Sequence, residues 1–168
     1  IGGSGGIGHF AVQIAKYYGA EVTAVCSTSN LGWVKDIGAD HVNHYIKQDF
    51  TKNGKKYDVI LDASAARTFF SCKRSLTENG FYMTENPTKP GFQLFQVLLG
   101  SLTRDKKMKG VGLTKTGGEN LEFIRELLEA GKIRPVIEKC YPLEQIAAAH
   151  RHVQNGHTKG KVVVEIVN

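Results

Sequence analysis

The chain has 168 residues, of which 41% are hydrophobic, 23% charged and 9% aromatic, and its formal net charge is +6. This composition excludes a disordered tail, and the length allows a compact domain that needs neither disulfides nor a structural metal to form a core. The longest apolar run, from Phe92 to Leu99, is interrupted by Gln93 and Gln96, so no membrane-spanning helix is predicted. We therefore expect a soluble protein, and the first residues do not resemble a signal peptide.

Cysteine and histidine spacing gives no sign of a metal site. The three cysteines, Cys26, Cys72 and Cys140, lie far apart and form no C-x-x-C pair, which favours reduced thiols in the cytoplasm. His150 and His152 are neighbours on a predicted helix and do not share one face, so no zinc site is expected within this chain.

The positive charge is dispersed rather than gathered into one stripe. Lysines and arginines occur over 52–56, 104–109 and 132–134, and aromatic residues are not interleaved with them. Such dispersion is typical of a solvated surface. We expect no nucleic-acid partner and no membrane partner.

Helical and extended patterns alternate along most of the chain. Apolar residues from Ile7 to Tyr18 recur at spacings of three and four, which predicts a helix that ends at Gly19. Val22 to Cys26 is apolar or small on both faces, as in a strand of a parallel sheet. The later elements predicted in order are a helix at Leu31–Ile37, strands at His41–Tyr45 and Tyr57–Asp62, a helix at Ala66–Leu76, a strand at Phe81–Thr84, a helix at Phe92–Leu102, a strand at Met108–Leu113 and a helix at Glu119–Ala130.

This alternation predicts an α/β fold of the Rossmann type, a doubly wound parallel sheet whose first strand is largely missing. The end of the chain departs from the rhythm. It is predicted to be a strand at Val136–Lys139, a helix at Leu143–Val153 and a strand at Lys161–Val167, and this strand–helix–strand tail is a candidate for a different sheet.

A glycine-rich loop opens the first helix. Gly3-Ser4-Gly5-Gly6-Ile7-Gly8 matches G-x-G-x-x-G, the pattern of dinucleotide-binding turns. The first glycine permits a tight turn, the second lets the backbone approach a pyrophosphate, and the third allows close helix packing, while the helix N-terminus favours an anion. The alternative is a purely structural turn. A P-loop is not indicated, because no Gly-Lys pair is followed by Ser or Thr.

The end of the second strand bears on the choice of cofactor. NAD sites carry an Asp or Glu there for the ribose hydroxyls, whereas this chain has Cys26 followed by Ser27-Thr28-Ser29-Asn30. No carboxylate would repel a 2'-phosphate, and short polar side chains are available to bind one, which favours NADP over NAD. The alternative is that Ser27 to Asn30 merely cap the next helix.

Several segments together resemble one family. They are Ile1 to Lys16, Gly19-Ala20, Cys26-Ser27-Thr28, Ile37 to Tyr45, Tyr57 to Asp62, Ala130 to Pro135 and Gly156 to Val163. In this order the chain resembles the medium-chain dehydrogenase/reductase superfamily, and within it the zinc-independent quinone oxidoreductases of the zeta-crystallin-like branch. The resemblance covers essentially the whole chain.

The resemblance implies a set of cofactor-binding residues. Gly5, Gly6 and Ile7, within the loop that also contains Gly3 and Ser4, would hold the pyrophosphate. The residues implied around the adenosine 2'-phosphate are Ser27, Ser29, Asn30 and Tyr45; those near the adenine ribose are Ala63 and Ser64; those toward the nicotinamide are Asn86 and Leu113. The segment Asp62-Ala63-Ser64-Ala65 of this chain departs from the family pattern, because it lacks the glycine often found after that strand.

The family also implies a domain organisation. Residues 1–133 would be the NADP-binding domain, and 134–168 would return to a catalytic domain absent from this chain, so the isolated chain is expected to be inactive and no catalytic residue is named. A homodimer joined through the strand at Met108–Leu113 is implied as well.

The resulting functional hypothesis is the NADP(H)-binding portion of an oxidoreductase that transfers a hydride from NADPH to a quinone or an activated enone or carbonyl. The alternative hypothesis is a non-catalytic NADP-binding module that senses redox state.

Overall fold

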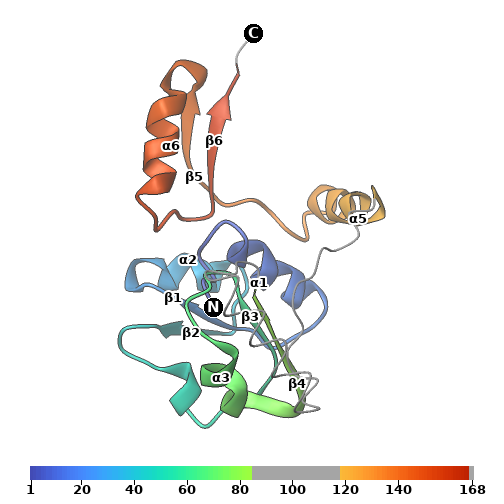
Figure 1. Ribbon diagram of the computed structural model, residues 1–168. Coiled ribbons are helices and arrows are strands. Elements are labelled where there is room, and N and C mark those ends of the chain that lie inside the picture. Colours follow the sequence, from blue (N-terminus) through green and yellow to red (C-terminus); the bar gives the residue numbers. More distant parts are fainter. Residues whose placement is uncertain (85–117, 167–168) are drawn as a thin grey trace. The chain divides into compact units, whose positions relative to one another are not determined.

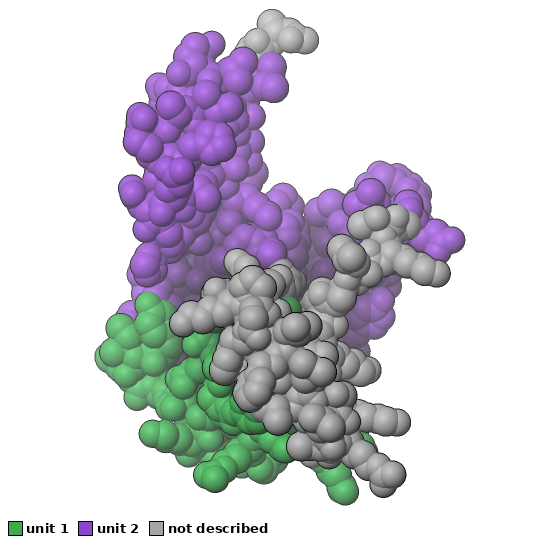
Figure 2. Space-filling view, viewed as in Figure 1, with its two compact units in different colours: residues 1, 45–117 green, residues 2–44, 118–168 purple. Residues whose placement is uncertain are grey.

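The computed structural model describes residues 1–84 and 118–166. The chain divides into two compact units, coloured separately in Figure 2: unit 1 holds residues 1 and 45–117, and unit 2 holds residues 2–44 and 118–168. The predicted helix at 92–102 and strand at 108–113 lie outside the described residues. Within the described ranges, no helix has the length and apolar character needed to cross a membrane.

Unit 2 contains most of the described elements. They are α1 (Gly8–Tyr17), β1 (Thr23–Cys26), α2 (Leu31–Asp36), β2 (His41–His44), α5 (Gly118–Glu129), β5 (Ile137–Pro142), α6 (Ile146–Gln154) and β6 (Lys161–Glu165), with 3-10 turns at Thr28–Asn30 and Leu143–Gln145 (Figure 1). Unit 1 contains β3 (Tyr57–Asp62), α3 (Phe69–Cys72), β4 (Leu76–Thr84) and 3-10 turns at Phe50–Lys52 and Lys73–Ser75.

The first helix and the two strands that follow it form the core of unit 2. Helix α1 ends as predicted where Gly19 adopts a left-handed φ of 76°, a conformation that glycine reaches without steric cost. Strands β1 and β2 pair in parallel. Buried side chains from α1, β1, α2 and the turn after α2 pack together: Val12, Ala24, Cys26, Val34 and Ala39. This burial on both faces of β1 confirms the prediction made from its composition.

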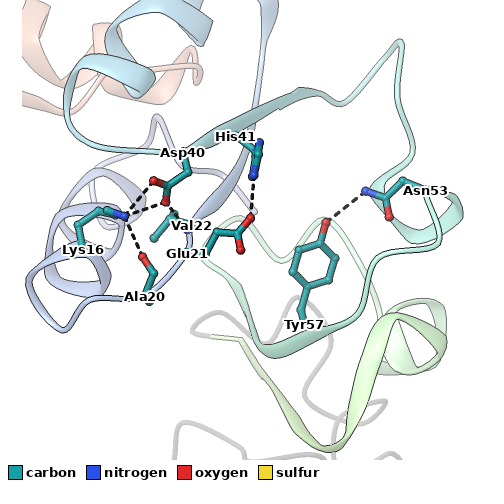
Figure 3. A network of polar contacts seen from close by, with 8 residues as sticks. All are labelled: Lys16, Ala20, Glu21, Val22, Asp40, His41, Asn53 and Tyr57. Carbon is teal, nitrogen blue, oxygen red and sulfur yellow. Dashed lines mark hydrogen bonds and ion pairs between the residues drawn. The ribbon is translucent and has the colours of Figure 1, made fainter.

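A polar network ties the end of α1 to both strands (Figure 3). Lys16 Nζ donates to the Asp40 carboxylate at 2.8 Å and to the carbonyl of Ala20 at 2.9 Å. Asp40 also accepts from the backbone amide of Val22 at 2.7 Å. Asp40, which directly precedes β2, thereby fixes the entry to β1 against the last turn of α1.

The third strand pair is separate from the others among the described residues. Strands β5 and β6 pair in parallel, and α6 lies along them (Figure 1). The predicted strand–helix–strand tail is therefore confirmed. Its first strand begins at Ile137 and continues to Pro142, and a 3-10 turn precedes the helix.

In unit 1 one predicted helix is shorter than expected. Strands β3 and β4 pair in parallel, but the helix expected over 66–76 is confined to Phe69–Cys72, and β4 begins at Leu76. The Asp62 carboxylate accepts from the amides of Ala66 and Arg67 at 3.3 and 2.8 Å, which holds the chain in a turn. Thr68 then caps the short helix through a reciprocal pair of bonds with Ser71, as capping boxes do.

The first residue of the chain is hydrogen-bonded alongside the end of β3. The Ile1 nitrogen donates to the Leu61 carbonyl at 2.6 Å, and the Ile1 carbonyl accepts from Ala63 at 3.1 Å. These two bonds place the backbone of Ile1 beside the end of β3.

Candidate cofactor-binding site

The glycine loop is a tight turn with little room for side chains. The amide of Gly5 donates to the Gly2 carbonyl at 2.9 Å, and the amides of Gly2 and Gly3 both donate to the carbonyl of Val25 in β1. A Cβ on Gly8 would lie 2.0 Å from the Gly2 carbonyl oxygen, and one on Gly3 would lie 3.0 Å from the Ala24 Cβ. The third glycine of the motif is thus required by close packing, as the pattern predicts.

The loop leaves several amides available for an anion. The amides of Gly6, Ile7 and Gly8 have no hydrogen-bond acceptor among the described residues. The first turn of α1 carries no acidic side chain, so the positive end of the helix dipole is not neutralised there. Among the described residues, a Cβ on Gly5 would meet only the Gly2 oxygen, at 3.4 Å, which leaves space beside the loop for a ligand.

His9 braces this loop from within unit 2. Its side chain is fully buried, and Nδ1 lies 2.9 Å from the Gly5 carbonyl oxygen. Burial lowers the pKa of His9, against the opposing effect of the bond to Gly5, and the charge of Lys161 lowers it further. A neutral imidazole that donates from Nδ1 therefore fixes the orientation of the Gly5 peptide.

The C-terminal segment also contacts the glycine loop, which sequence patterns did not predict. The Gly160 amide donates to the Ser4 carbonyl at 2.9 Å. A Cβ built on Gly6 would lie 3.4 Å from Lys161 Nζ, so a cation stands beside the available amides. Further along α1, the buried Gln13 side chain donates to the Arg134 carbonyl at 2.9 Å and accepts from its amide at 2.8 Å.

The end of β1 carries a cluster of short polar side chains. Asn30 is buried and donates from Nδ2 to Ser27 Oγ at 2.9 Å, while Ser27 Oγ lies 3.3 Å from Ser29 Oγ. Ser27 and Asn30 stand at the N-cap positions of the 3-10 turn and of α2, but neither makes a side-chain cap hydrogen bond there. The hydroxyls of Ser27, Ser29 and the exposed Thr28 and the amide of Asn30 gather at this strand end.

The remaining predicted site residues are distributed elsewhere. Tyr45, Ala63 and Ser64 belong to unit 1, and Asn86 and Leu113 lie outside the described residues. Ser64 is held by its neighbour Asp62, whose Oδ1 accepts from the Ser64 amide at 3.1 Å and from its hydroxyl at 3.0 Å.

Asp62 is a structural residue that the sequence reasoning missed. It is fully buried, and Tyr82 donates to its Oδ2 at 3.2 Å. Burial, with the Asp62 charge second, raises the pKa of the Tyr82 hydroxyl, which stays protonated as the donor. Ala65 in the same loop has a left-handed φ of 50°. This is the loop in which the family pattern has a glycine, and a glycine at 65 would adopt that angle without strain.

Comparison with known proteins gives a consistent result. The family model described as "Zinc-binding dehydrogenase" matches residues 37–164. The chain is 35% identical over 166 residues to the chloroplast envelope quinone oxidoreductase homolog of Arabidopsis thaliana, covering 96% of this chain and 50% of that protein. It is 34% identical over 186 residues to the mitochondrial NAD(P)H oxidoreductase RTN4IP1 of Homo sapiens, covering 99% of this chain and 47% of that protein.

A solved structure shows the same fold. The quinone oxidoreductase from Coxiella burnetii superimposes with a TM-score of 0.84 at 25% identity, over 99% of this chain and 51% of that one. The chain thus spans about half the length of the proteins it matches. The Rossmann-type α/β fold predicted from the sequence is confirmed.

Proposed function

The chain belongs to the zinc-binding dehydrogenases of the medium-chain dehydrogenase/reductase superfamily, and we propose that it is the NADP(H)-binding portion of an oxidoreductase. In this proposal a hydride passes from NADPH to a quinone or to an activated enone or carbonyl. The observation that carries it is the glycine loop, in which three consecutive amides without described acceptors meet the N-terminus of α1.

The loop residues have distinct roles in the proposed site. We assign the pyrophosphate to the amides of Gly6, Ile7 and Gly8, because a helix N-terminus with unpaired amides binds phosphate. The Gly5 amide already donates to Gly2, so Gly5 serves by leaving space. His9 keeps the Gly5 peptide in place. Lys161 adds a positive charge beside the loop, and we expect it to strengthen phosphate binding.

The rest of the cofactor is assigned from the family pattern. We propose that Ser27, Ser29 and Tyr45 surround the 2'-phosphate, with Asn30 holding Ser27. The residues proposed for the adenine ribose are Ala63 and Ser64, and those proposed for the nicotinamide are Asn86 and Leu113. When bound, the nicotinamide supplies the hydride, and this chain's residues bind and orient it.

Among the described residues, no three His, Cys, Asp or Glu side chains come together in an arrangement that would hold a metal ion.

Two measurements test the proposed function. NADPH fluorescence titration of the folded protein should show saturable binding, and the full-length protein should oxidise NADPH when a small quinone is added. Saturable binding without turnover would favour the non-catalytic redox-sensing module. Absence of binding to a sample that unfolds cooperatively would contradict both readings.

A homodimer and a cytoplasmic location complete the proposal. They come from the family pattern and from three cysteines that are all free thiols. Light scattering would give the mass of the assembly, and cell fractionation the compartment. A monomer by the first measurement, or recovery with an organelle by the second, would contradict the respective part.

A further inference from the structure

Two side chains from different strands meet at the edge where β1 and β2 end. In the parallel register Cys26 lies opposite His44, so the turn after β1 and the last residue of β2 share this edge. Thr28 Oγ1, in that turn, lies 2.7 Å from His44 Nε2. Thr28 is exposed and His44 is buried, which puts a buried ring nitrogen directly behind an exposed hydroxyl.

The direction of this hydrogen bond decides what Thr28 offers to a ligand. When Nε2 carries the proton, it donates to Oγ1 and leaves the hydroxyl hydrogen of Thr28 available for an anion. When Nε2 is unprotonated, the Thr28 hydroxyl must donate to it, and Thr28 then offers only oxygen lone pairs to a ligand. A phosphate requires the first state, because its oxygens accept hydrogen bonds, whereas a ribose hydroxyl is accommodated by either.

The hydroxyl of the adjacent residue, Ser27, also has a buried donor behind it, and the direction of this hydrogen bond is fixed. The indole Nε1 of Trp33 donates to Asn30 Oδ1 at 3.1 Å. An indole N–H can only donate, so the amide of Asn30 must turn its nitrogen toward Ser27 Oγ, 2.9 Å away. Ser27 accepts from Asn30, so its own hydrogen points away from Asn30, toward Ser29 Oγ at 3.3 Å or toward a ligand.

We propose that these buried donors, which lie behind the hydroxyls of Thr28 and Ser27, select the 2'-phosphorylated cofactor. Thr28 and Ser27 donate to the phosphate, while His44 and Asn30 are positioning residues that turn those hydroxyls into donors. The inference rests on the proposed function, since it concerns the same cofactor. It adds His44, which neither the glycine motif nor the family pattern identifies, and makes Thr28 the hydroxyl through which His44 favours NADPH over NADH.

Binding constants for NADPH and NADH test the proposal. Thr28→Val removes the hydroxyl at nearly constant shape and is expected to raise the Kd for NADPH about tenfold, because one hydrogen bond to a charged group is lost. The Kd for NADH should change less than twofold. His44→Phe should act like Thr28→Val. His44→Gln, whose amide nitrogen can replace Nε2 as donor, should restore at least half of the lost selectivity.

The control and the interaction between the two sites complete the experiment. His41→Phe changes the same residue type at the opposite end of β2, where His41 contacts Glu21 on the surface (Figure 3), and should leave both constants unchanged. The double variant of Thr28 and His44 should lose no more than either single variant, because both act through one hydroxyl.

Three outcomes would overturn the inference. The first is a Thr28→Val protein that folds and binds NADPH as tightly as the wild type, and the second is a His44→Phe protein that loses NADPH and NADH equally. The third is wild-type protein that binds neither nucleotide, which would remove the proposed function itself. In the first two cases the wild type still binds NADPH, so the two failures are distinguishable.

Discussion

Replacing Gly8 by alanine tests the packing of the cofactor loop most severely. The added Cβ would lie 2.0 Å from the Gly2 oxygen and 2.9 Å from the Gly3 Cα. Ordinary contact begins at 3.4 Å, so the loop or the start of α1 must move by about 1.4 Å. Overpacking of this kind costs about 1–3 kcal/mol of unfolding free energy.

The same displacement should weaken NADPH binding. Two of the amides that we assign to the pyrophosphate would no longer point at it, and each hydrogen bond to a charged group contributes about 1.5 kcal/mol. The Kd for NADPH is therefore expected to rise about a hundredfold. Fluorescence titration gives the Kd, and urea denaturation gives the free energy of unfolding.

Two companion variants separate folding from binding. In the protein without cofactor there is room for the Cβ of Gly5→Ala, so this variant should keep the wild-type free energy of unfolding. It should lose NADPH affinity, because the Cβ would occupy the space of the ligand. Gly118→Ala, with no described atom within 4 Å of its Cβ, should change neither quantity substantially. If Gly8→Ala and Gly5→Ala both bound NADPH within threefold of the wild type, the assignment of this loop would be refuted.

Three further predictions concern stability. The hydrogen bond from Lys16, and after it the one from the Val22 backbone amide, holds the pKa of Asp40 below its ordinary value. The resulting stabilisation is present above the ordinary pKa and is lost as the pH falls through the lower pKa of the folded protein, so Asp40→Asn should flatten the pH dependence of Tm below about pH 4. A variant whose Tm falls with decreasing pH as steeply as that of the wild type would contradict this. Ala65→Gly should raise the free energy of unfolding by about 0.5–1 kcal/mol, since glycine adopts a left-handed φ without strain; urea denaturation measures it, and a loss of stability would argue against the strain. Gln13→Met removes both partners of the Arg134 backbone and should cost about 2 kcal/mol in the same assay, whereas a neutral effect would show that water replaces those bonds.

Local patterns predicted most of the fold. The apolar stripe of α1 and the left-handed Gly19 that ends it depend on neighbouring residues, and the structure confirms both. The helix expected over 66–76 was wrong because the buried Asp62 binds the amides that would have begun it. Apolar periodicity does not show that a carboxylate four or five residues earlier in the chain competes for these backbone amides.

The candidate site was only partly predictable for the same reason. The glycine spacing indicated the loop and the requirement for Gly8, which are encoded within six consecutive residues. The approach of Lys161 to the loop joins segments more than 150 residues apart, and the contact of Thr28 with His44 depends on the register of two strands. Neither leaves a spacing signal in the sequence.

The most direct test of the central claim is to follow the backbone amides of Gly6, Ile7 and Gly8 by NMR while NADPH is added to the ¹⁵N-labelled protein. We predict that these three resonances move downfield together and saturate with the same Kd that fluorescence reports. Saturable NADPH binding that leaves all three resonances in place would contradict the claim that this loop holds the cofactor.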